Sequence, residues 1–229
     1  MSSEIRFPKS AQRTPCVLVL DASGSMEEES TPGRTRIDEL NAGIQILQRD
    51  LMADSTARTR IELCIVCVGG PAGDADLLMD WTDVPSFMPP PLSAGGMTPL
   101  GEGVRIALSQ VEDRKRYYKN NGYSYTRPWI IVVSDGEPTD NPAEWQSACQ
   151  SALDAINSKK ALIFPVGVDG DANLHVLSQL SDKPALGMNA VNFQEFFQWV
   201  SSSLGSVASS RPGEGIQLAP VNAWATVSA

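Results

Sequence analysis

Oxygen-bearing side chains come directly after two apolar runs and in one glycine-rich turn, where their types could bind a divalent cation. The five residues are Asp21, Ser23, Ser25, Thr98 and Asp135. Two carboxylates and three hydroxyls form an all-oxygen set, which suits a hard cation such as Mg²⁺ rather than zinc or copper. Mg²⁺ gives up its water ligands reluctantly, so some of these groups are expected to act through water. If only hydroxyls touch the ion, it keeps positive charge toward solvent and attracts an external carboxylate.

The elements that must position these residues follow an alternating pattern of apolar runs and amphipathic segments. The predicted strands are 16–20, 61–68, 77–81, 129–133, 161–168 and a weaker 185–188. The predicted helices are 37–51, 100–111, 145–156, 174–180 and 193–204. Because only a short link separates 61–68 from 77–81, 77–81 is expected to be an antiparallel edge strand.

This alternation predicts an α/β fold, a doubly wound sheet that is mostly parallel, in one domain. We expect an N-terminal extension at 1–13, the domain at 14–205, and a C-terminal tail at 206–229 with a docked piece near 216–224. Such sheets bind ligands beyond the carboxyl ends of their strands, at the switch point. If strands 16–20 and 129–133 are neighbours there, the five side chains converge.

Composition and charge exclude several classes of function. The 229 residues carry 27 acidic and 18 basic side chains, a net charge of −9, which argues against binding nucleic acid or anionic membranes. No apolar run is long enough for a membrane span, and residues 1–15 lack the core of a signal peptide, so a cytoplasmic location is expected. The four cysteines lie in apolar contexts that favour reduced, packed thiols, and a single histidine leaves no zinc ligand set.

The five oxygen-bearing residues, in this order and spacing, resemble the metal-ion-dependent adhesion site of von Willebrand factor type A (vWA) domains. The resemblance covers about residues 14–205 and implies a three-layer, Rossmann-like sandwich and a non-enzymatic protein-binding module. It implies that Ser23, Ser25 and Thr98 are direct or switchable ligands, whereas Asp21 and Asp135 act largely through water. A partner's Asp or Glu would complete the shell of Mg²⁺, with Mn²⁺ or Ca²⁺ as alternatives.

Two turns narrow the resemblance to the TerY-like vWA proteins of bacterial tellurite-resistance and stress-response gene clusters. They are residues 95–101, Gly-Gly-Met-Thr-Pro-Leu-Gly, and residues 134–140, Ser-Asp-Gly-Glu-Pro-Thr-Asp. This likeness implies protein partners that are kinase-like or phosphatase-like products of the same gene cluster. Nothing in the residues themselves indicates tellurite chemistry.

One alternative is a Mg²⁺-dependent phosphohydrolase of the haloacid-dehalogenase type, with Asp21 as the nucleophile. Such enzymes generally carry a second Asp where this chain has Ser23, and Lys159 and Lys160 precede a strand, at the wrong edge of the sheet. Beside the site, Glu27, Glu28 and Glu29 could add metal affinity or repel an acidic partner, or they could form a solvated acidic loop. Residues 169–173 could border the partner surface or form the N-terminal turn of a helix. The tyrosine-rich stretch 117–125 is expected to be a structured loop at the amino edge.

Overall fold

The fold is a seven-stranded sheet in the order β5-β4-β1-β6-β7-β8-β9. It is seen in a computed structural model that describes residues 11–135, 137–168, 172–188, 192–211, 215–216, 218–221 and 224–226. The strands are β1 (Thr14–Ala22), β4 (Ile61–Gly69), β5 (Asp74–Asp83), β6 (Trp129–Ser134), β7 (Leu162–Val168), β8 (Leu186–Met188) and β9 (Ala225–Thr226). Neighbouring strands from β4 to β8 are parallel, and β5 is the antiparallel edge strand that the sequence predicts. The short β9, which the sequence does not predict, pairs antiparallel with β8 at the other edge.

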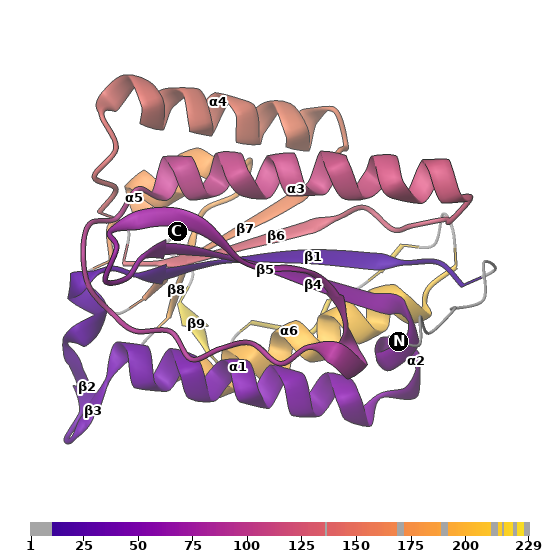
Figure 1. Cartoon of the computed structure of the whole chain (residues 1–229), viewed down its shortest axis with the longest axis horizontal. Coiled ribbons are helices and arrows are strands. Elements are labelled where there is room, and N and C mark those ends of the chain that lie inside the picture. Colours follow the sequence, from indigo (N-terminus) through magenta and orange to yellow (C-terminus); the bar gives the residue numbers. More distant parts are fainter. Residues whose placement is uncertain are drawn as a thin grey trace.

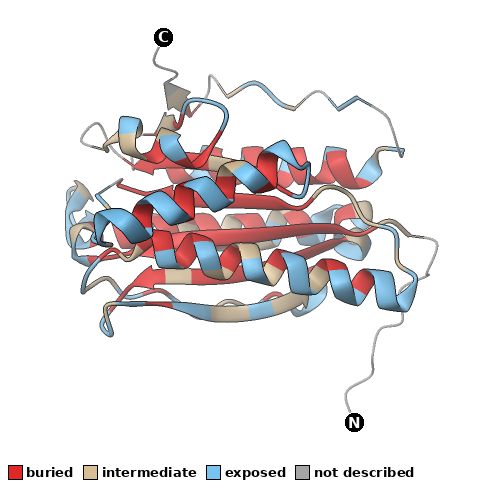
Figure 2. Cartoon of the chain, turned by 90° about the horizontal axis from the view of Figure 1, so that it is seen from above, coloured by how far each residue is buried: buried red, intermediate tan, exposed pale blue. Residues whose placement is uncertain are grey.

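Helices cover both faces of the sheet and make three layers (Figure 1). They are α1 (Arg36–Ala53), α2 (Ser55–Arg60), α3 (Leu100–Asn121), α4 (Pro142–Asn157), α5 (Leu174–Leu177) and α6 (Phe193–Ser209). One apolar core lies between the sheet and α1, α2 and α6, and a second lies between the sheet and α3, α4 and α5. Each helix turns its buried side toward the sheet (Figure 2).

Burial on both faces explains why β1 reads as an almost continuous apolar run. All nine residues of β1 are buried, and alternate side chains enter the two cores. Cys64 and Cys67 of β4 likewise contribute to opposite cores, and all four cysteines are free, which agrees with packed thiols. Among the helices that the structure describes, none has the length and apolar character needed to cross a membrane.

Two helices continue past their predicted ends. Helix α3 continues to Asn121 and ends at Gly122 with φ +73°, so Tyr117 and Tyr118 lie in a helix and not in a loop. Tyr118 is buried and donates a hydrogen bond to Glu62, and this contact extends the helix beyond its apolar stripe. Helix α6 also runs past its predicted end, to Ser209.

A hairpin that the sequence analysis did not predict projects beside the carboxyl end of β1. Strands β2 (Glu29–Thr31) and β3 (Arg34–Thr35) pair antiparallel around Pro32 and Gly33, whose φ is +79° (Figure 1). A Pro-Gly pair is a turn signal, but strands of two or three residues show no periodicity.

Candidate functional site

The sheet order places the ends of β1 and β6 side by side. Strand β1 pairs parallel with β6 from Cys16–Trp129 to Leu20–Val133, as the convergence of the predicted site requires. Asp21 is the residue after Leu20, the last residue of β1 that pairs with β6, and Asp135 directly follows β6. Ser134 Oγ donates a 2.5 Å hydrogen bond to Asp21 Oδ2, which ties the two strand ends together.

The loop after β1 folds back on its own carboxylate. The backbone N–H of Ser23 donates to Asp21 Oδ1 at 2.8 Å, and the Ser23 and Ser25 hydroxyl oxygens lie 3.1 Å apart. Ser25 Oγ donates to Asp135 Oδ2, so the hydroxyl of one loop reaches the carboxylate of the other. Four of the five predicted residues, Asp21, Ser23, Ser25 and Asp135, therefore form one hydrogen-bonded group.

The turn that carries Thr98 packs against the same loop through backbone contacts. Gly24 N–H donates to Gly96 O at 3.2 Å. A Cβ atom at Gly69, whose φ is +84°, would lie 2.6 Å from Met97 O and 2.8 Å from Ser23 N. Only glycine fits there, because both the left-handed backbone and the close approach exclude a side chain.

Thr98 is also held by the loop after β6. Its N–H donates to Thr139 Oγ1 at 3.0 Å, and its carbonyl accepts from Thr139 N–H at 2.9 Å. Asp140 then accepts from the N–H groups of Gly101 and Glu102 at 2.9 and 3.1 Å, which caps the start of α3. The three loops that carry the predicted residues are thus joined to one another by hydrogen bonds.

The electrostatics of this group are unusual because, in the part of the chain that the structure describes, negative charge is buried without a paired Lys or Arg. Asp21 is fully buried, and Asp135 is 8% exposed. Among the described residues, neither carboxylate forms an ion pair, and Asp135 Oδ1 is buried with no hydrogen-bond partner. Burial raises the pKa of Asp21 to about 6; the hydrogen bond from Ser134 opposes this shift and the charge of Asp135 adds to it.

These features fit a hard divalent cation bound by hydroxyls as well as carboxylates. The described residues contain no group of three or more His, Cys, Asp or Glu that could hold a metal ion. A cation here must therefore use serine and threonine oxygens, which Mg²⁺ accepts. The unpartnered Asp135 Oδ1 is an acceptor that a cation or its water would satisfy.

The remaining residues singled out in the sequence divide between the two edges of the sheet. Glu27, Glu28 and Glu29 are exposed beside the site. Asn173 N–H donates to Asp135 O at 3.1 Å, whereas 169–171 and Gly136 lie outside the described residues. Lys159 and Lys160 follow α4 at the opposite edge, where they cannot assist Asp21.

Three residues orient the site in a way that sequence reasoning did not predict, although all three lie in the quoted segment 134–140: Ser134, Thr139 and Asp140. Ser134 and Asp140 hydrogen bond across 113 and 39 positions respectively, so spacing alone carries no signal for them. Thr139 reaches Thr98 across 41 positions in the same way.

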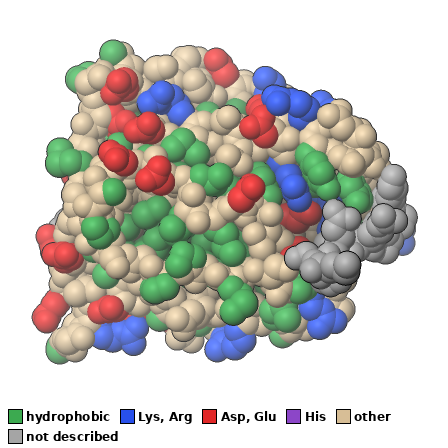
Figure 3. Space-filling view, viewed as in Figure 1, with side chains coloured by type: hydrophobic (Ala, Val, Ile, Leu, Met, Phe, Trp, Pro, Cys, Tyr) green, Lys and Arg blue, Asp and Glu red, His purple; other side chains and the backbone are tan. Residues whose placement is uncertain are grey.

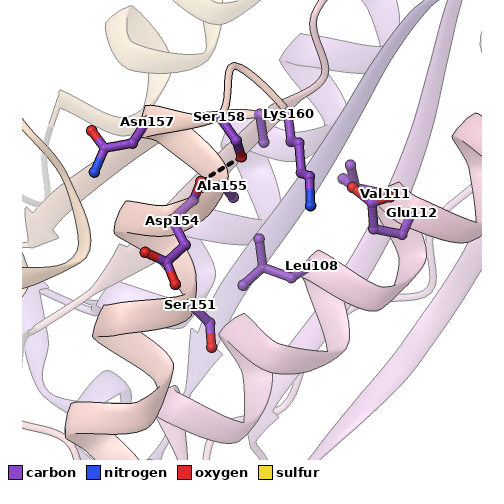
Figure 4. A pocket seen from close by; sticks show the side chains of 10 residues that line it. Leu108, Val111, Glu112, Ser151, Asp154, Ala155, Asn157, Ser158 and Lys160 are labelled. Atoms are coloured by element: carbon purple, nitrogen blue, oxygen red, sulfur yellow. Dashed lines mark hydrogen bonds between the residues drawn. The ribbon is translucent and has the colours of Figure 1, made fainter.

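Two cavities lie away from this group. An opening of about 720 Å³ between α3 and α4 is lined by Glu112, Asp154 and Lys160 around apolar side chains (Figure 4). A smaller cavity of about 300 Å³ lies beside β7 and β8 and is lined mostly by apolar residues, including Phe164 and Trp199. None of the five predicted site residues lines either one.

Comparisons with known proteins identify the fold. No protein-family model matches the chain, and no curated protein matches it. Among solved structures, the vWF domain of the type V pili tip protein Mfa5 from Porphyromonas gingivalis matches with a TM-score of 0.62 and 12% identity, over 90% of this chain and 99% of that one. The pilus adhesin SpaC from Lactobacillus rhamnosus GG matches with a TM-score of 0.64 and 13% identity, over 86% of this chain but 31% of that one.

A further match is proximal thread matrix protein 1 from the mussel byssus, in a structure whose metal-ion-dependent adhesion site holds zinc. Its TM-score is 0.54 and its identity 11%, over 84% of this chain and 48% of that one. The chain thus spans about half of this protein and a third of SpaC. At these identities the likeness establishes the vWA fold alone.

Proposed function

We propose that this chain, which has the fold of a vWA domain, is a Mg²⁺-dependent protein-interaction module that captures a carboxylate of its partner. The observation that carries the proposal is the buried pair Asp21 and Asp135, which forms no ion pair among the described residues and in which Asp135 Oδ1 is buried without a hydrogen-bond partner there. The surrounding hydroxyls supply the oxygen ligands that a hard cation prefers.

In this proposal Asp21, Ser23, Ser25, Thr98 and Asp135 hold the metal. The hydroxyls of Ser23, Ser25 and Thr98 would be direct or switchable ligands, and the two carboxylates would act largely through water. When bound, the ion supplies a positive, Lewis-acidic position that faces out of the sheet edge and attracts the Asp or Glu of a partner. Mn²⁺ and Ca²⁺ are the alternative ions, since they also prefer oxygen ligands.

We assign no catalytic role to these residues. A nucleophilic Asp21 would need a free oxygen beside its substrate, but both of its oxygens accept hydrogen bonds and the residue is fully buried. No observation favours the phosphohydrolase alternative.

The cellular setting is a separate part of the proposal. A role in a bacterial tellurite-resistance or stress-response system, in the cytoplasm, with kinase-like or phosphatase-like partners, rests on the resemblance of residues 95–101 and 134–140 to TerY-like proteins. It is independent of the metal chemistry and can fail without affecting it.

The first experiment measures Mg²⁺ binding by calorimetry in the wild type, in Thr98→Ala and in Thr59→Ala. Thr59 is an exposed threonine of α2 at the opposite edge, so its variant is a matched control. Binding is expected in the wild type and in Thr59→Ala, and its loss is expected in Thr98→Ala. Equal binding by all three proteins would contradict the proposed ligand set.

The partner is then sought by quantitative affinity capture from a lysate of the source cell. The comparison is wild type in Mg²⁺, wild type in EDTA, and Thr98→Ala in Mg²⁺. A protein retained only in the first sample supports carboxylate capture through the metal. The same set of proteins in all three samples would show that the metal site is not the binding surface.

A further inference from the structure

The opening between α3 and α4 lies toward the amino edge of the sheet, where α4 ends (Figure 4). Its volume is about 720 Å³, within the range of roughly 300 to 1,000 Å³ that is usual for small-molecule sites. None of the five proposed metal ligands lines it. A ligand bound here would therefore be separate from the metal chemistry.

The floor of the opening is apolar. Val111, Ala155 and Ala161 are buried there, and Leu108 is half-buried one turn before Val111 on α3. Because two of these four side chains are alanines, the protein itself does not fill the space between the helices. A ligand with apolar groups would remove this floor from water, which is favourable.

The rim of the opening carries charges of both signs. Glu112 on α3 accepts a hydrogen bond from Lys115 Nζ at 2.7 Å, and Asp154 on α4 accepts one from Gln150 Nε2 at 2.9 Å. Lys160 follows α4, and its side chain reaches into the space between the two helices (Figure 4). In the part of the chain that the structure describes, Lys160 forms no ion pair. Its ammonium group is therefore available to a ligand that enters the opening.

The chain turns into the opening through a lysine whose backbone has a conformation typical of glycine. Lys159 has a φ of +56° and, among the described residues, is the only residue other than glycine with a positive φ. Hydrogen bonds from Lys159 N–H to Ile156 O at 2.9 Å and from Lys160 N–H to Ala155 O at 2.8 Å close the turn, in a helix end that usually has glycine at this position. Strained residues of this kind are concentrated at ligand sites, and here the turn places Lys160 at the opening.

The mixture of charges selects among the classes of ligand. Acidic and basic side chains lie next to one another along the upper side of the molecule in Figure 3, over α3 and α4, although the net charge of the chain is −9. A ligand with only negative charge would meet Glu112, Asp154 and the negative end of α4. A ligand with only positive charge would meet Lys160. A ligand that carries one charge of each sign can pair with both kinds of group.

We infer that the opening binds a free dipeptide or tripeptide with apolar side chains. The ammonium group of the peptide pairs with Asp154 and Glu112, its carboxylate pairs with Lys160, and its side chains cover the apolar floor. A single amino acid is smaller than the drug-sized ligands that openings of this volume bind, and the terminus of a protein chain offers only one of the two charges. This inference goes beyond the proposed function and does not depend on it.

The test uses four synthetic compounds: leucyl-leucine, its N-acetylated form, its C-terminal amide, and glycyl-glycine. The last three lack the ammonium charge, the carboxylate charge and the apolar side chains respectively. Binding is measured from amide chemical shifts of the ¹⁵N-labelled full chain. Leucyl-leucine is expected to bind with a dissociation constant of about 1 mM or lower, equally in Mg²⁺ and in EDTA. The loss of either charge should weaken binding severalfold, up to about fivefold, and glycyl-glycine should not bind measurably.

Three outcomes would overturn the inference. Full affinity of the acetylated form would show that the ammonium group is not recognised and would assign the opening to carboxyl termini or other anions. Full affinity of the amide would show that the carboxylate is not recognised. The absence of shifts with leucyl-leucine at about ten times the expected dissociation constant would exclude the site altogether.

Two lysine variants test the carboxylate position. Lys160→Met and Lys159→Met remove the same charge at neighbouring positions, and of the two residues Lys160 lines the opening. Lys160→Met is expected to weaken leucyl-leucine binding severalfold, up to about fivefold, and to leave binding of the amide unchanged. Lys159→Met is expected to change neither. An equal loss in both variants would indicate net charge alone and would contradict a role for Lys160.

Two serine variants test the location. Ser147 and Ser151 are exposed and lie one turn apart on α4, and of the two Ser151 lines the opening. Ser151→Phe is expected to lose the shifts that leucyl-leucine causes, because the ring blocks the opening, whereas Ser147→Phe should keep them. Thermal melting checks that both variants fold. Unchanged binding by folded Ser151→Phe would place the peptide elsewhere and would overturn the inference.

Discussion

The two ends of the sheet both bury charged groups, but they compensate them differently. At the amino end, Glu62 of β4 is buried with Arg114, whose Nε and Nη2 lie 2.9 and 2.8 Å from Glu62 Oε2. Arg13 Nη1 lies 3.8 Å from Glu62 Oε1, and the hydroxyl of Tyr118 also donates to Glu62. Every charge in this cluster meets an opposite charge or a hydrogen-bond donor within the chain.

At the carboxyl end, Asp21 and Asp135 are buried with hydroxyls and with each other. The contrast appears in the titration of the two clusters. Burial lowers the pKa of Arg114, but the charge of Glu62 and the contact with Tyr118 outweigh this effect, so the net shift is upward. Burial and the neighbouring carboxylate act in the same direction on Asp21 and raise its pKa to about 6.

Unpaired buried charge costs several kcal/mol per ion, so a fold retains it only where something else compensates. At the amino end, the buried charges pair with opposite charges, which serves stability. At the carboxyl end, the described residues supply no opposite charge for Asp21 and Asp135, which is the physical reason to look for function there. The difference predicts that removing charge destabilises one end and not the other.

The largest effect is expected at the amino end. Glu62→Gln removes the buried carboxylate that pairs with Arg114, whose side chain is 19% exposed, and should lower the free energy of unfolding by about 3–5 kcal/mol. Urea denaturation in Mg²⁺ and in EDTA checks this, and the loss should be the same in both. Glu144→Gln removes an exposed carboxylate from α4 and should change stability little. A loss that Mg²⁺ reverses would mean that the two ends are coupled.

The next effect is a dependence on pH at the carboxyl end in the absence of metal. Because the folded-state pKa of Asp21 is about 6, above its ordinary value of 3.8, its contribution to stability is fully present below about pH 4 and is lost as the pH rises through 6. The loss amounts to about 3 kcal/mol at 1.36 kcal/mol per unit of pKa. Urea denaturation in EDTA at several values of pH measures it.

Other carboxylates also titrate over this range, so the comparison needs Asp21→Asn. The difference in unfolding free energy between wild type and this variant isolates Asp21, and it should change in favour of the variant between pH 4 and pH 6. A constant difference across this range would contradict a raised pKa. Saturating Mg²⁺ should remove the wild type's loss and leave the variant unchanged.

Asp135→Asn gives the third effect, a change in the free energy of unfolding relative to wild type whose sign differs between EDTA and Mg²⁺. Without metal, the variant removes the charge beside Asp21 and should be as stable as the wild type or up to about 1 kcal/mol more stable. With Mg²⁺ at 100 times its dissociation constant, the wild type should gain about 2.7 kcal/mol and the variant should gain little. Equal stabilisation of both proteins by Mg²⁺ would place the ion elsewhere.

Long elements of the fold can be predicted from the sequence, whereas short ones cannot. The long strands contain apolar runs, such as 16–20 and 129–133, and the length of the links between strands determines which strand is antiparallel. The strands β2, β3 and β9 have two or three residues each, too few for any pattern. The last turns of α3 are polar in sequence and show no apolar stripe. Tyr118 packs there through a hydroxyl contact with Glu62, a residue 56 positions away, which the local sequence does not indicate.

For the site, the five candidate ligands are predicted from their residue types and from the rule that ligands bind beyond the carboxyl ends of parallel strands. That these residues bind a metal stays a prediction. Four of those side chains form a hydrogen-bonded group because parallel strands end at one edge. The residues that orient them could not be predicted. Asp140 and Thr139 act through backbone groups of a distant turn, and such pairing follows from the three-dimensional path of the loops.

The smallest effect tests this orienting role. Pro99 precedes α3 and makes no side-chain cap, so Asp140 supplies the acceptor for Gly101 and Glu102 instead. Asp140→Ala should cost about 1 kcal/mol of unfolding free energy in EDTA, as for the loss of an N-cap. Because the same loop holds Thr98 through Thr139, Mg²⁺ affinity should fall as well, although Asp140 is not among the proposed ligands. Asp140→Asn keeps one acceptor oxygen and should restore part of both losses. If Asp140→Ala lowered stability and left Mg²⁺ affinity unchanged, the cap would be a purely structural feature of α3, and the position of Thr98 would depend on the close packing at Gly69 alone.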